Sequence, residues 1–356
     1  MNELKDLKDF AINMENVPIL NFDSLASWAD PDLEELLELA AELKARNYRS
    51  DAGRGKVLGL IFFNPSLRTK VSFETAAIHL GAGSTVIHPG SGSWPLETRI
   101  GAVMDGNKTE HIKEAVGVLS RYCDVIGVRA FAGLKDRFED AGDTLIRRIV
   151  EFADVPVINL ESANEHPCQG MADWLTLSEL FPDGTAQRSF VLSWAPHPNP
   201  LPMAVPNTAL EVAIRSGMDV TLACPPEYLP DDDRLGYLRS LADGKGSYFD
   251  ISHDQEQGFR DADVIYAKSW ASQQLVYDNP EEEARLRREE YRGWTVSEAR
   301  MNLTNNARFM HCLPVRRNVV VTDKVLDSAN AVHIQQAENR LHVQKAILMK
   351  LWNLSL

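Results

Sequence analysis

Four short groups of residues have side chains that could bind an anion or a carbonyl oxygen. They are Ser66-Leu67-Arg68-Thr69, the single Arg129, His166-Pro167-Cys168-Gln169 and His311-Cys312-Leu313-Pro314-Val315-Arg316-Arg317. Arginine keeps its charge and presents a planar fork of N–H donors that matches the oxygens of phosphates and carboxylates. Histidine and glutamine add neutral donors for a carbonyl oxygen. These residue types suit an anion in some of the groups and a carbonyl oxygen in others.

The first group lies where an expected strand turns into an expected helix. Residues 57–63 form an apolar run of the length of a buried strand, Asn64-Pro65 breaks it, and an apolar helical face follows, closed by Gly81. The start of a helix presents free backbone N–H groups, to which Ser66, Arg68 and Thr69 add donors. The turn therefore predicts a phosphate site, although a capped helix with a surface arginine would explain the same residues.

The other three groups also have structural explanations. Arg129 ends an apolar run and needs an anionic or carbonyl partner there, or else a structural salt bridge. His166 and Gln169 are three residues apart, so they share one face of a helical turn, where a histidine can equally serve as a cap. Cys312 is the best candidate for a reactive thiol in the chain, whereas we expect Cys168 to have a packing role.

The elements that must position these groups alternate between strands and helices. Strands are expected at 57–63, 84–90, 123–131, 155–162, 189–196, 218–225, 262–270, 308–315 and 331–336. Helices are expected at 31–47, 107–122, 140–153, 164–181 and before 217, with an extended proline-rich loop at 197–207 and a solvated helix or flexible lid at 279–292. This rhythm is typical of parallel sheets covered on both faces, and ligands bind at the carboxyl ends of their strands.

The pattern predicts an α/β fold with two doubly wound parallel-sheet domains. We expect them at 1–163 and 164–335, followed by a C-terminal helix at 336–356 that returns to the first domain. The length of 356 residues also suits two domains, and 44% hydrophobic and 25% charged residues are ordinary for a globular protein. A dehydrogenase and a P-loop ATPase are disfavoured, because no strand is followed by the glycine fingerprint or phosphate loop of either class.

Charge and cysteine usage restrict the partners. The net charge of −14 argues against a general binder of nucleic acids or anionic membranes. The four cysteines form no CxxC pair, which predicts a reducing compartment and no zinc site. Residues 1–17 are acidic and polar, so we expect no signal peptide, and no apolar run reaches the roughly 18 residues of a membrane span. The cytoplasm is the expected location.

Taken together, the groups resemble the aspartate/ornithine transcarbamylase superfamily over nearly the whole chain. The turn at 66–69 is similar to the family's carbamoyl phosphate signature, His166-Pro167-Cys168-Gln169 to its HPxQ motif and His311-Cys312-Leu313-Pro314 to its HCLP motif. The resemblance implies an enzyme that moves the carbamoyl group of carbamoyl phosphate to an amine and releases phosphate, without a cofactor or a metal. A non-catalytic anion-binding protein on the same fold is the alternative from another class.

The resemblance also implies roles in the carbamoyl phosphate half of the site. The turn with Arg68 would hold the phosphate, and Arg129, His166 and Gln169 would stabilise the charge that grows on the carbonyl oxygen. Backbone carbonyls at Cys312 and Leu313 would accept hydrogen bonds from the carbamoyl amide. The implied ligands are Ser66, Leu67, Arg68, Thr69, Trp94, Arg129, His166, Gln169, Cys312, Leu313 and Arg340, of which Arg129, His166, Gln169 and Cys312 form the catalytic set.

For the amine, the chain resembles the branch of the family that acts on N-acylated ornithine. The resemblance is carried by the SWPLE loop around Trp94, the proline-rich loop, YAKSW at 266–270 and the stretch 303–318. In this branch the proline-rich loop and the loop after Lys268 cross, which implies a knotted second domain. Trp94 reaches the site of a neighbouring subunit, which implies a homotrimer. The residues implied for the acylornithine pocket are Glu161, His197, Lys268, Arg316, Thr109 and Pro202.

Three positions bear on the acyl group. Members acting on acetylornithine look to have Glu at Thr109, Asn at Pro202 and Lys at Val320, whereas succinylornithine members have Pro at the Thr109 position. A glutamate there would repel the distal carboxylate of a succinyl group, while Thr109 is uncharged and Arg316 could pair with that carboxylate. We therefore expect transfer to the δ-amine of N2-succinyl-L-ornithine, giving N-succinyl-L-citrulline in arginine biosynthesis. N-acetyl-L-ornithine is the alternative acceptor.

Overall fold

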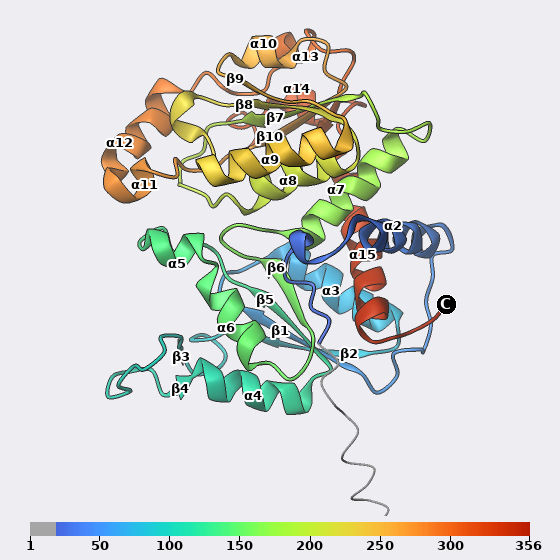
Figure 1. Cartoon of the computed structure of the whole chain (residues 1–356), viewed down its shortest axis with the longest axis vertical. Coiled ribbons are helices and arrows are strands. Elements are labelled where there is room, and N and C mark those ends of the chain that lie inside the picture. The colour runs from blue at the N-terminus through green and yellow to red at the C-terminus, as the bar shows by residue number, and fades with distance from the viewer. Residues whose placement is uncertain (1–18) are drawn as a thin grey trace, which may run out of the picture.

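The computed structural model describes residues 19–356, which form two lobes, each built on one parallel β-sheet (Figure 1). The N-terminal segment in which no signal peptide was expected lies outside the described residues. The strand order is β2-β1-β5-β6 in the first sheet and β11-β10-β7-β8-β9 in the second. The neighbouring strands of both sheets are parallel. The expected α/β fold with two doubly wound sheets is therefore confirmed.

The strands and helices alternate along the chain. The strands are β1 (Val57–Phe62), β2 (Gly83–Ile87), β3 (Leu96–Glu97), β4 (Glu110–His111), β5 (Val125–Arg129), β6 (Val157–Glu161), β7 (Ser189–Trp194), β8 (Asp219–Ala223), β9 (Phe249–Ser252), β10 (Val264–Lys268) and β11 (Arg308–Met310). The helices of the first lobe are η1 (Leu25–Ser27), α2 (Asp30–Ala45), α3 (Leu67–His79), α4 (Ile112–Tyr122), α5 (Arg137–Ala141) and α6 (Thr144–Phe152). The helices that follow are α7 (Pro167–Leu180), α8 (Ala204–Arg215), η2 (Pro226–Tyr228), α9 (Asp232–Lys245), α10 (Gln255–Phe259), α11 (Leu275–Asp278), α12 (Pro280–Arg285), η3 (Leu286–Glu290), α13 (Glu298–Met301), α14 (Asp323–Leu326) and α15 (His333–Leu351).

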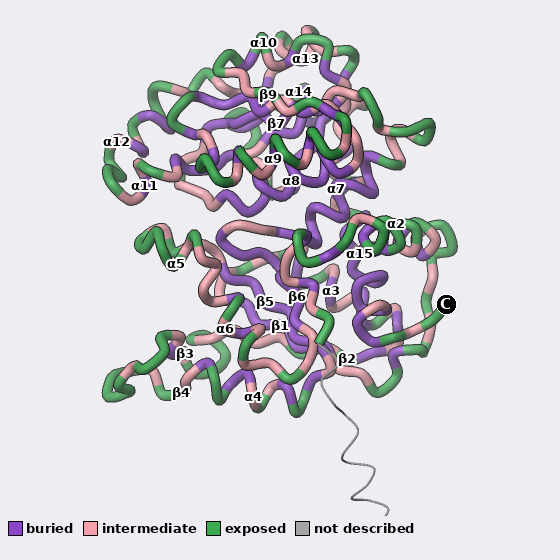
Figure 2. The backbone as a smooth tube through the Cα atoms, viewed as in Figure 1, coloured by how far each residue is buried: buried purple, intermediate pink, exposed green. Residues whose placement is uncertain are grey.

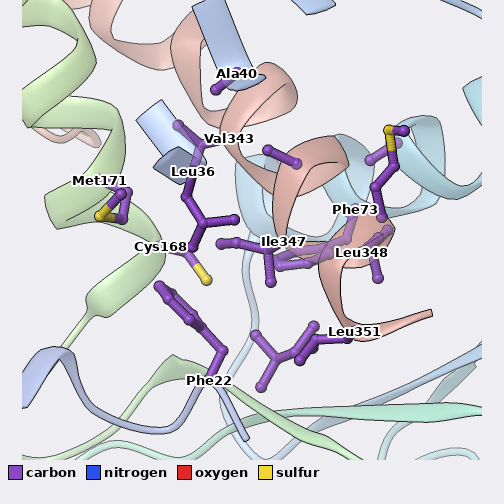
Figure 3. Close-up of a cluster of buried hydrophobic side chains, with 14 of the residues drawn as sticks. Phe22, Leu36, Ala40, Phe73, Cys168, Met171, Val343, Ile347, Leu348 and Leu351 are labelled. Carbon is purple, nitrogen blue, oxygen red and sulfur yellow. The ribbon is translucent and has the colours of Figure 1, made fainter. Parts of the chain in front are cut away.

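Strands β1, β5 and β6 of the first sheet are buried on both faces, which explains why they read as continuous apolar runs, whereas the edge strand β2 is partly exposed. Leu58, Leu60 and Phe62 of β1 point into a core shared with α2, α3, α7 and α15. Ile61 points to the opposite face and packs in the core of α4 and α6. Figure 3 shows the first of these cores, where Phe73 of α3 meets residues of α2, α7 and α15.

Two helices join the lobes and return the chain. Helix α7 leads from the first sheet to the second, is buried over most of its length, and packs against α2, α8 and α15 (Figure 2). Helix α15 packs against α2, α3 and α7, so the C-terminal helix returns to the first lobe as expected. Both helices therefore connect residues that lie far apart in the sequence.

Several boundaries differ from those expected. The strand predicted at 331–336 is wrong, because Ala331 forms an isolated bridge to Phe309 and α15 begins at His333. The strand predicted at 308–315 ends at Met310. The polar edge strand β9 was missed. The proline-rich stretch is shorter than predicted, because α8 begins at Ala204 and Pro206 lies in its first turn, where its missing N–H is not needed.

The charged stretch at 279–292 is more tightly held than the predicted solvated helix or lid. It folds into α12 and η3, in which Glu283 and Arg287 are each 1% exposed. The guanidinium of Arg287 donates to both carboxylate oxygens of Glu283, and its Nη1 donates to the backbone oxygen of His197 at 2.6 Å. This segment thus anchors the start of the proline-rich loop. Across residues 19–356, no helix has the length and apolar character needed to cross a membrane.

Candidate active site

A cavity of about 400 Å³ lies between the carboxyl ends of the strands of the two sheets. It collects residues that follow β1, β5, β6, β7, β10 and β11, as parallel sheets of this kind predict. The sequence-predicted residues that line it are Ser66, Leu67, Arg68, Thr69, Arg129, Glu161, His166, Gln169, His197, Pro202, Lys268, Cys312, Leu313 and Arg340. The four groups singled out in the sequence therefore meet at one place.

The turn at the start of α3 forms the first-lobe wall of the cavity. Ser66 is the N-cap of this 13-residue helix, and its hydroxyl accepts a hydrogen bond from the backbone N–H of Thr69 at 3.2 Å. The side chain of Thr69 is fully buried and receives Nη2 of Arg340 at 2.9 Å. The free N–H groups of the first helical turn and the adjoining Arg68 guanidinium suit an anion.

The arginines of the cavity have donors to spare. Arg129 donates to a carboxylate oxygen of Glu161, and its guanidinium lies 4.4 Å from the ring centroid of Phe131. Arg340 donates to Oε1 of Gln169 at 3.2 Å as well as to Thr69. Among the described residues, Nε of Arg129 and Nε of Arg340 are buried without a hydrogen-bond partner. Arg129 and Arg340 thus each keep a donor that no group of the described chain satisfies.

The charge of the cavity is opposite to that of the whole chain. Its cationic lining residues are Arg68, Arg129, Lys268 and Arg340, and Glu161 is its one carboxylate. Burial lowers the pKa of Arg68 and of Arg340, which shows that desolvation disfavours their charges when the cavity holds no anion. A phosphate-bearing ligand would relieve both costs.

Three histidines beside the cavity are neutral. Burial and nearby cations hold the pKa of His166 and of His311 well below the ordinary value, and burial lowers that of His197 to about 4. Nδ1 of His311 accepts the backbone N–H of Leu313 at 2.8 Å, so its proton lies on Nε2. His197 donates from Nδ1 to the Asn199 oxygen at 2.8 Å and accepts from Nε of Arg316 at 2.9 Å.

His166 is placed to donate to a ligand. Its backbone N–H binds Oγ1 of Thr208 at 3.0 Å, and its Nε2 lies 3.5 Å from a carboxylate oxygen of Glu161. Its Nδ1 is buried without a hydrogen-bond partner in the described chain. A neutral imidazole has one N–H to offer, and a carbonyl oxygen is a suitable acceptor for it.

Burial disfavours the thiolate form of the cysteines in and beside the cavity. Burial raises the pKa of Cys312, and it raises the pKa of Cys168 to about 12. A protonated, buried thiol is a poor nucleophile, which argues against a reactive thiol at Cys312, and the catalytic role expected for this residue stays a prediction. Cys312 and Leu313 line the cavity in a turn where Leu313 adopts a φ of 58° before Pro314, and the role expected of their backbone carbonyls stays a prediction.

Three predicted residues lie outside the cavity of a single chain. Trp94 is 64% exposed and Thr109 is exposed, both in the segment between β2 and α4. Arg316 is exposed and reaches the cavity through its hydrogen bond to His197. The predicted contacts of Trp94 and Thr109 with substrate, and the predicted reach of Trp94 into a neighbouring subunit, stay predictions.

Sequence reasoning missed several residues that shape the cavity. Phe131, Leu201, Val205 and Ser269 line it, but each lacks a reactive group that would distinguish it in a sequence. Asp173 and Gln336 do not line it, yet they hold residues that do. Asp173 lies one helical turn beyond Gln169, and this spacing was the available signal.

The comparisons with known proteins agree with this geometry. The model of the aspartate/ornithine carbamoyltransferase carbamoyl-P binding domain matches residues 21–179, and that of the Asp/Orn binding domain matches residues 203–351. The chain belongs to the aspartate/ornithine carbamoyltransferase family, and it is a carbamoyltransferase of the branch that contains the N-acylornithine enzymes. The domain boundaries at 163 and 335 stay predictions.

Relatives in two subgroups cover almost the whole chain. N-acetylornithine carbamoyltransferase of Xanthomonas campestris pv. campestris is 45% identical over 334 residues, which cover 93% of this chain and 97% of that protein. N-succinylornithine carbamoyltransferase of Bacteroides thetaiotaomicron is 39% identical over 320 residues, which cover 90% of this chain and 94% of that protein. The overall similarity thus favours the acetyl relatives over the succinyl relatives that the sequence analysis preferred.

Solved structures of acetylornithine transcarbamylase superpose closely. One holds acetylcitrulline, with a TM-score of 0.90 and 43% identity over 93% of this chain and 99% of that chain. Another is a variant in which a glutamate is replaced by proline, in complex with carbamyl phosphate and N-succinyl-L-norvaline. It also has a TM-score of 0.90 and 43% identity, with the same coverage.

Proposed function

We propose that the chain transfers the carbamoyl group of carbamoyl phosphate to the δ-amine of an N-acylated ornithine. The observation that carries this proposal is the cluster of Arg68, Arg129 and Arg340 at the start of α3, with buried guanidinium nitrogens that have no partner in the described chain. Phosphate oxygens would occupy the helix start and Arg68. Arg129 and the neutral His166 would donate to the carbonyl oxygen as it gains charge in the tetrahedral transition state.

The reaction needs no covalent enzyme intermediate. The δ-nitrogen forms a bond to the carbonyl carbon, the bond from that carbon to the phosphate oxygen breaks, and the amine loses a proton. A free alkylamine has a pKa of about 10.4, so the site must favour the neutral amine. Lys268 and the arginines would do this by repelling an ammonium group, and the leaving phosphate is the base we propose for the proton.

The acylornithine would enter from the second lobe. The predicted residues His197, Lys268 and Pro202 line the cavity from the second lobe, Arg316 supports His197, and Glu161 lines it from the end of β6 in the first lobe. In this arrangement the incoming amine and the Arg129 guanidinium compete for the carboxylate of Glu161. We propose that the amine displaces part of the contact between Glu161 and Arg129, which frees donors of Arg129 for the carbonyl oxygen.

N-acetylornithine is the first acceptor that we propose. The acetyl relatives are more similar to this chain overall, at 45% identity against 39% for the succinyl relatives. Structures with a TM-score of 0.90 include acetylornithine transcarbamylase with acetylcitrulline. Overall similarity of sequence and structure is the support for this acceptor.

N-succinylornithine is the second candidate, and a specific observation favours it. The sequence analysis places the uncharged Thr109 where acetylornithine enzymes carry a glutamate. Variants of the acetyl enzyme with a glutamate replaced by proline, alanine or serine are found with N-succinyl-L-norvaline and carbamyl phosphate. Loss of a negative charge is therefore compatible with a succinyl group in that enzyme. Val320 also makes the cavity wall apolar where acetyl enzymes look to have lysine.

One assay tests the proposal and ranks the acceptors. The purified protein is incubated with carbamoyl phosphate and, in parallel, with ornithine, N-acetylornithine or N-succinylornithine, and the ureido product is measured. We expect product with an N-acylated ornithine and little with free ornithine. If free ornithine is the best substrate, or if no amine gives product, the proposed function is wrong. The kcat/KM ratio of the two acylornithines decides between the acyl groups.

A further inference from the structure

Asp173 lies on α7 behind the cavity, and its side chain is a meeting point for two glutamines. It is 2% exposed and is not among the residues that line the cavity. Its Oδ1 accepts Nε2 of Gln169, on the same helix, at 2.7 Å. The same oxygen accepts Nε2 of Gln336, on α15, at 2.7 Å. One carboxylate oxygen thus receives both amides.

This arrangement fixes which way each amide faces. A glutamine side chain can donate from its nitrogen or accept at its oxygen, and the two ends are similar in shape. Because both nitrogens point to Asp173, both oxygens point away from it. Oε1 of Gln169 accepts Nη1 of Arg340 at 3.2 Å, and Oε1 of Gln336 accepts the backbone N–H of His311 at 2.9 Å.

Each glutamine leads to a different wall of the cavity. Nη2 of Arg340 also donates to Oγ1 of Thr69 at 2.9 Å, in the turn at the start of α3. Nδ1 of His311 accepts a hydrogen bond from the backbone N–H of Leu313 at 2.8 Å, in the turn after β11. The first wall belongs to the first lobe and the second wall to the second lobe. Asp173 therefore connects the two halves of the site through α7 and α15.

We propose that Asp173 is a positioning residue for carbamoyl transfer, which keeps the Arg340 guanidinium and the backbone of the 311–314 turn in register with each other. The inference rests on the proposed function of the cavity. Loss of the Asp173 acceptor frees both amides to rotate, and a rotated amide presents N–H to Arg340 or to the His311 N–H. The amide N–H would then face the Arg340 guanidinium at one wall and the His311 N–H at the other. This repulsion would displace Arg340, which holds the phosphate, and the 311–314 backbone, which holds the carbamoyl amide.

The role needs an acceptor atom at Oδ1 and does not need a negative charge. Burial raises the pKa of Asp173 to about 7, so both protonation states are populated near neutral pH. A proton on Oδ2 leaves Oδ1 free to accept both amides. Asparagine has the same shape and keeps an oxygen acceptor, whereas alanine has none. This difference separates a positioning role from a requirement for charge.

The test compares Asp173→Ala, Asp173→Asn and the control Thr176→Val. Thr176 lies one turn further along α7, is fully buried, and its Oγ1 accepts Nδ2 of Asn339 on α15 at 2.9 Å. Thr176→Val therefore removes a buried hydrogen bond between the same two helices and leaves the contacts of both glutamines in place. Each variant is assayed for kcat and KM with carbamoyl phosphate, for the Kd of inorganic phosphate by calorimetry, and for Tm.

For Asp173→Ala we expect kcat to fall by about a hundredfold, because small misplacements of binding groups have effects of this size. We expect its Kd for phosphate to rise by about tenfold, since Arg340 is released. Asp173→Asn should restore both values to within about threefold of the unmodified protein. Thr176→Val should lower Tm and leave kcat and Kd unchanged. The inference is overturned if Asp173→Ala lowers Tm alone, or if Asp173→Asn is as impaired as Asp173→Ala.

A further variant separates the two branches. Gln336→Leu removes the acceptor of the His311 N–H and leaves Gln169 on Asp173. We expect it to lower kcat while the Kd for inorganic phosphate stays unchanged, because phosphate would contact the α3 turn and Arg340. A rise in that Kd equal to the rise in Asp173→Ala contradicts the two-branch arrangement. Phosphate binding needs no acylornithine, so these comparisons stand even if the proposed acceptor is wrong.

Discussion

Individual charges decide what the cavity can hold. Arg68, Arg129, Lys268 and Arg340 face one carboxylate, Glu161, in a chain whose net charge is −14. Fixed cations in a site that excludes water stabilise developing negative charge more strongly than they would in bulk solvent. The chemistry of the site thus depends on the donors that are left unpaired, more than on any single acid or base.

Arg340 gives the sharpest residue-scale prediction for catalysis. Arg340→Gln removes the guanidinium that joins Thr69 to Gln169, and we expect kcat/KM for carbamoyl phosphate to fall by about a hundredfold to a thousandfold. Steady-state kinetics at saturating acylornithine measure this. The matched control is Arg121→Gln, whose guanidinium pairs with Asp154 on the surface. Equal losses in the two variants would show that the effect is general and not a property of the cavity.

Thr109 gives the prediction for the acyl group. Thr109→Glu adds a negative charge that would repel the distal carboxylate of a succinyl group and leave an acetyl group unaffected. We expect KM for N-succinylornithine to rise by about tenfold or more, with little change for N-acetylornithine. Thr109→Ser is the uncharged control. A similar loss with both substrates, or no loss with either, would contradict a role for charge at this position.

The buried carboxyl of Asp173 predicts how stability depends on pH. Its pKa is raised to about 7 by burial, so the folded state binds a proton that the unfolded chain releases above about pH 4. Stability due to this group is therefore greatest below about pH 4 and falls as the pH rises to about 7. Asp173→Asn should make that fall shallower by up to about 1.4 kcal/mol per pH unit. Urea unfolding between these limits measures it, and parallel curves for the two proteins would contradict the assignment.

At the scale of elements, the strand ends were the part that the sequence predicted well. Buried parallel strands read as apolar runs, so the positions of Arg129, Glu161 and Lys268 at strand ends followed from the pattern. The edge strand β9 was missed although its apolar and polar residues alternate, because a run of four half-exposed residues is a short signal. The 331–336 stretch alternates like a strand but continues into α15, because its helical neighbours pack on α2 and α7.

The site shows the same division between local and long-range information. Residues in compact motifs, such as Ser66 and His166, could be found because type and spacing reveal them. Asp173 and Gln336 act across 163 positions of the chain, and a single sequence gives no sign of that pairing. Thr109 and Trp94 could be named from the family resemblance, but neither lines the cavity of the single chain.

The close approach of α7 and α8 gives the element-scale prediction. A Cβ on Gly170 of α7 would collide with Cγ2 of Thr208 and come within 3.0 Å of Cγ1 of Val212, both on α8. We expect Gly170→Ala to destabilise the protein by about 1–3 kcal/mol through overpacking. The control Gly236→Ala lies on an exposed face of α9 with open space around it, and should stabilise by about 0.5–1 kcal/mol. Urea unfolding compares them, and equal stability would contradict the packing argument.

At the scale of the whole molecule, the segment between β2 and α4 is the feature that a single chain leaves unexplained. Trp94 is 64% exposed, Ile100 59% and Val103 80%, although they are large and apolar. Exposed apolar clusters of this kind mark interfaces. This agrees with the predicted homotrimer in which Trp94 reaches a neighbouring site, and both the trimer and the knotted second domain stay predictions.

Mixed subunits test the trimer prediction directly. Trp94→Ala and Arg129→Ala are each expected to be inactive. Trp94→Ala removes the side chain that is predicted to reach the neighbouring subunit's site, and Arg129→Ala removes a side chain of the subunit's own cavity. In random mixed trimers about a quarter of the sites combine an intact Trp94 with an intact Arg129. Co-expression should therefore restore about a quarter of the original activity. Activity no higher than the sum of the two parents would contradict a shared site.

The central claim is the transfer of a carbamoyl group to the δ-amine of an N-acylornithine. The most direct measurement incubates the protein with isotope-labelled carbamoyl phosphate and an equal mixture of ornithine, N-acetylornithine and N-succinylornithine, and locates the label by mass spectrometry. We expect the label in the ureido carbon of an N-acylcitrulline, in step with phosphate release. Label in free citrulline, or phosphate release without a labelled ureido product, would contradict it.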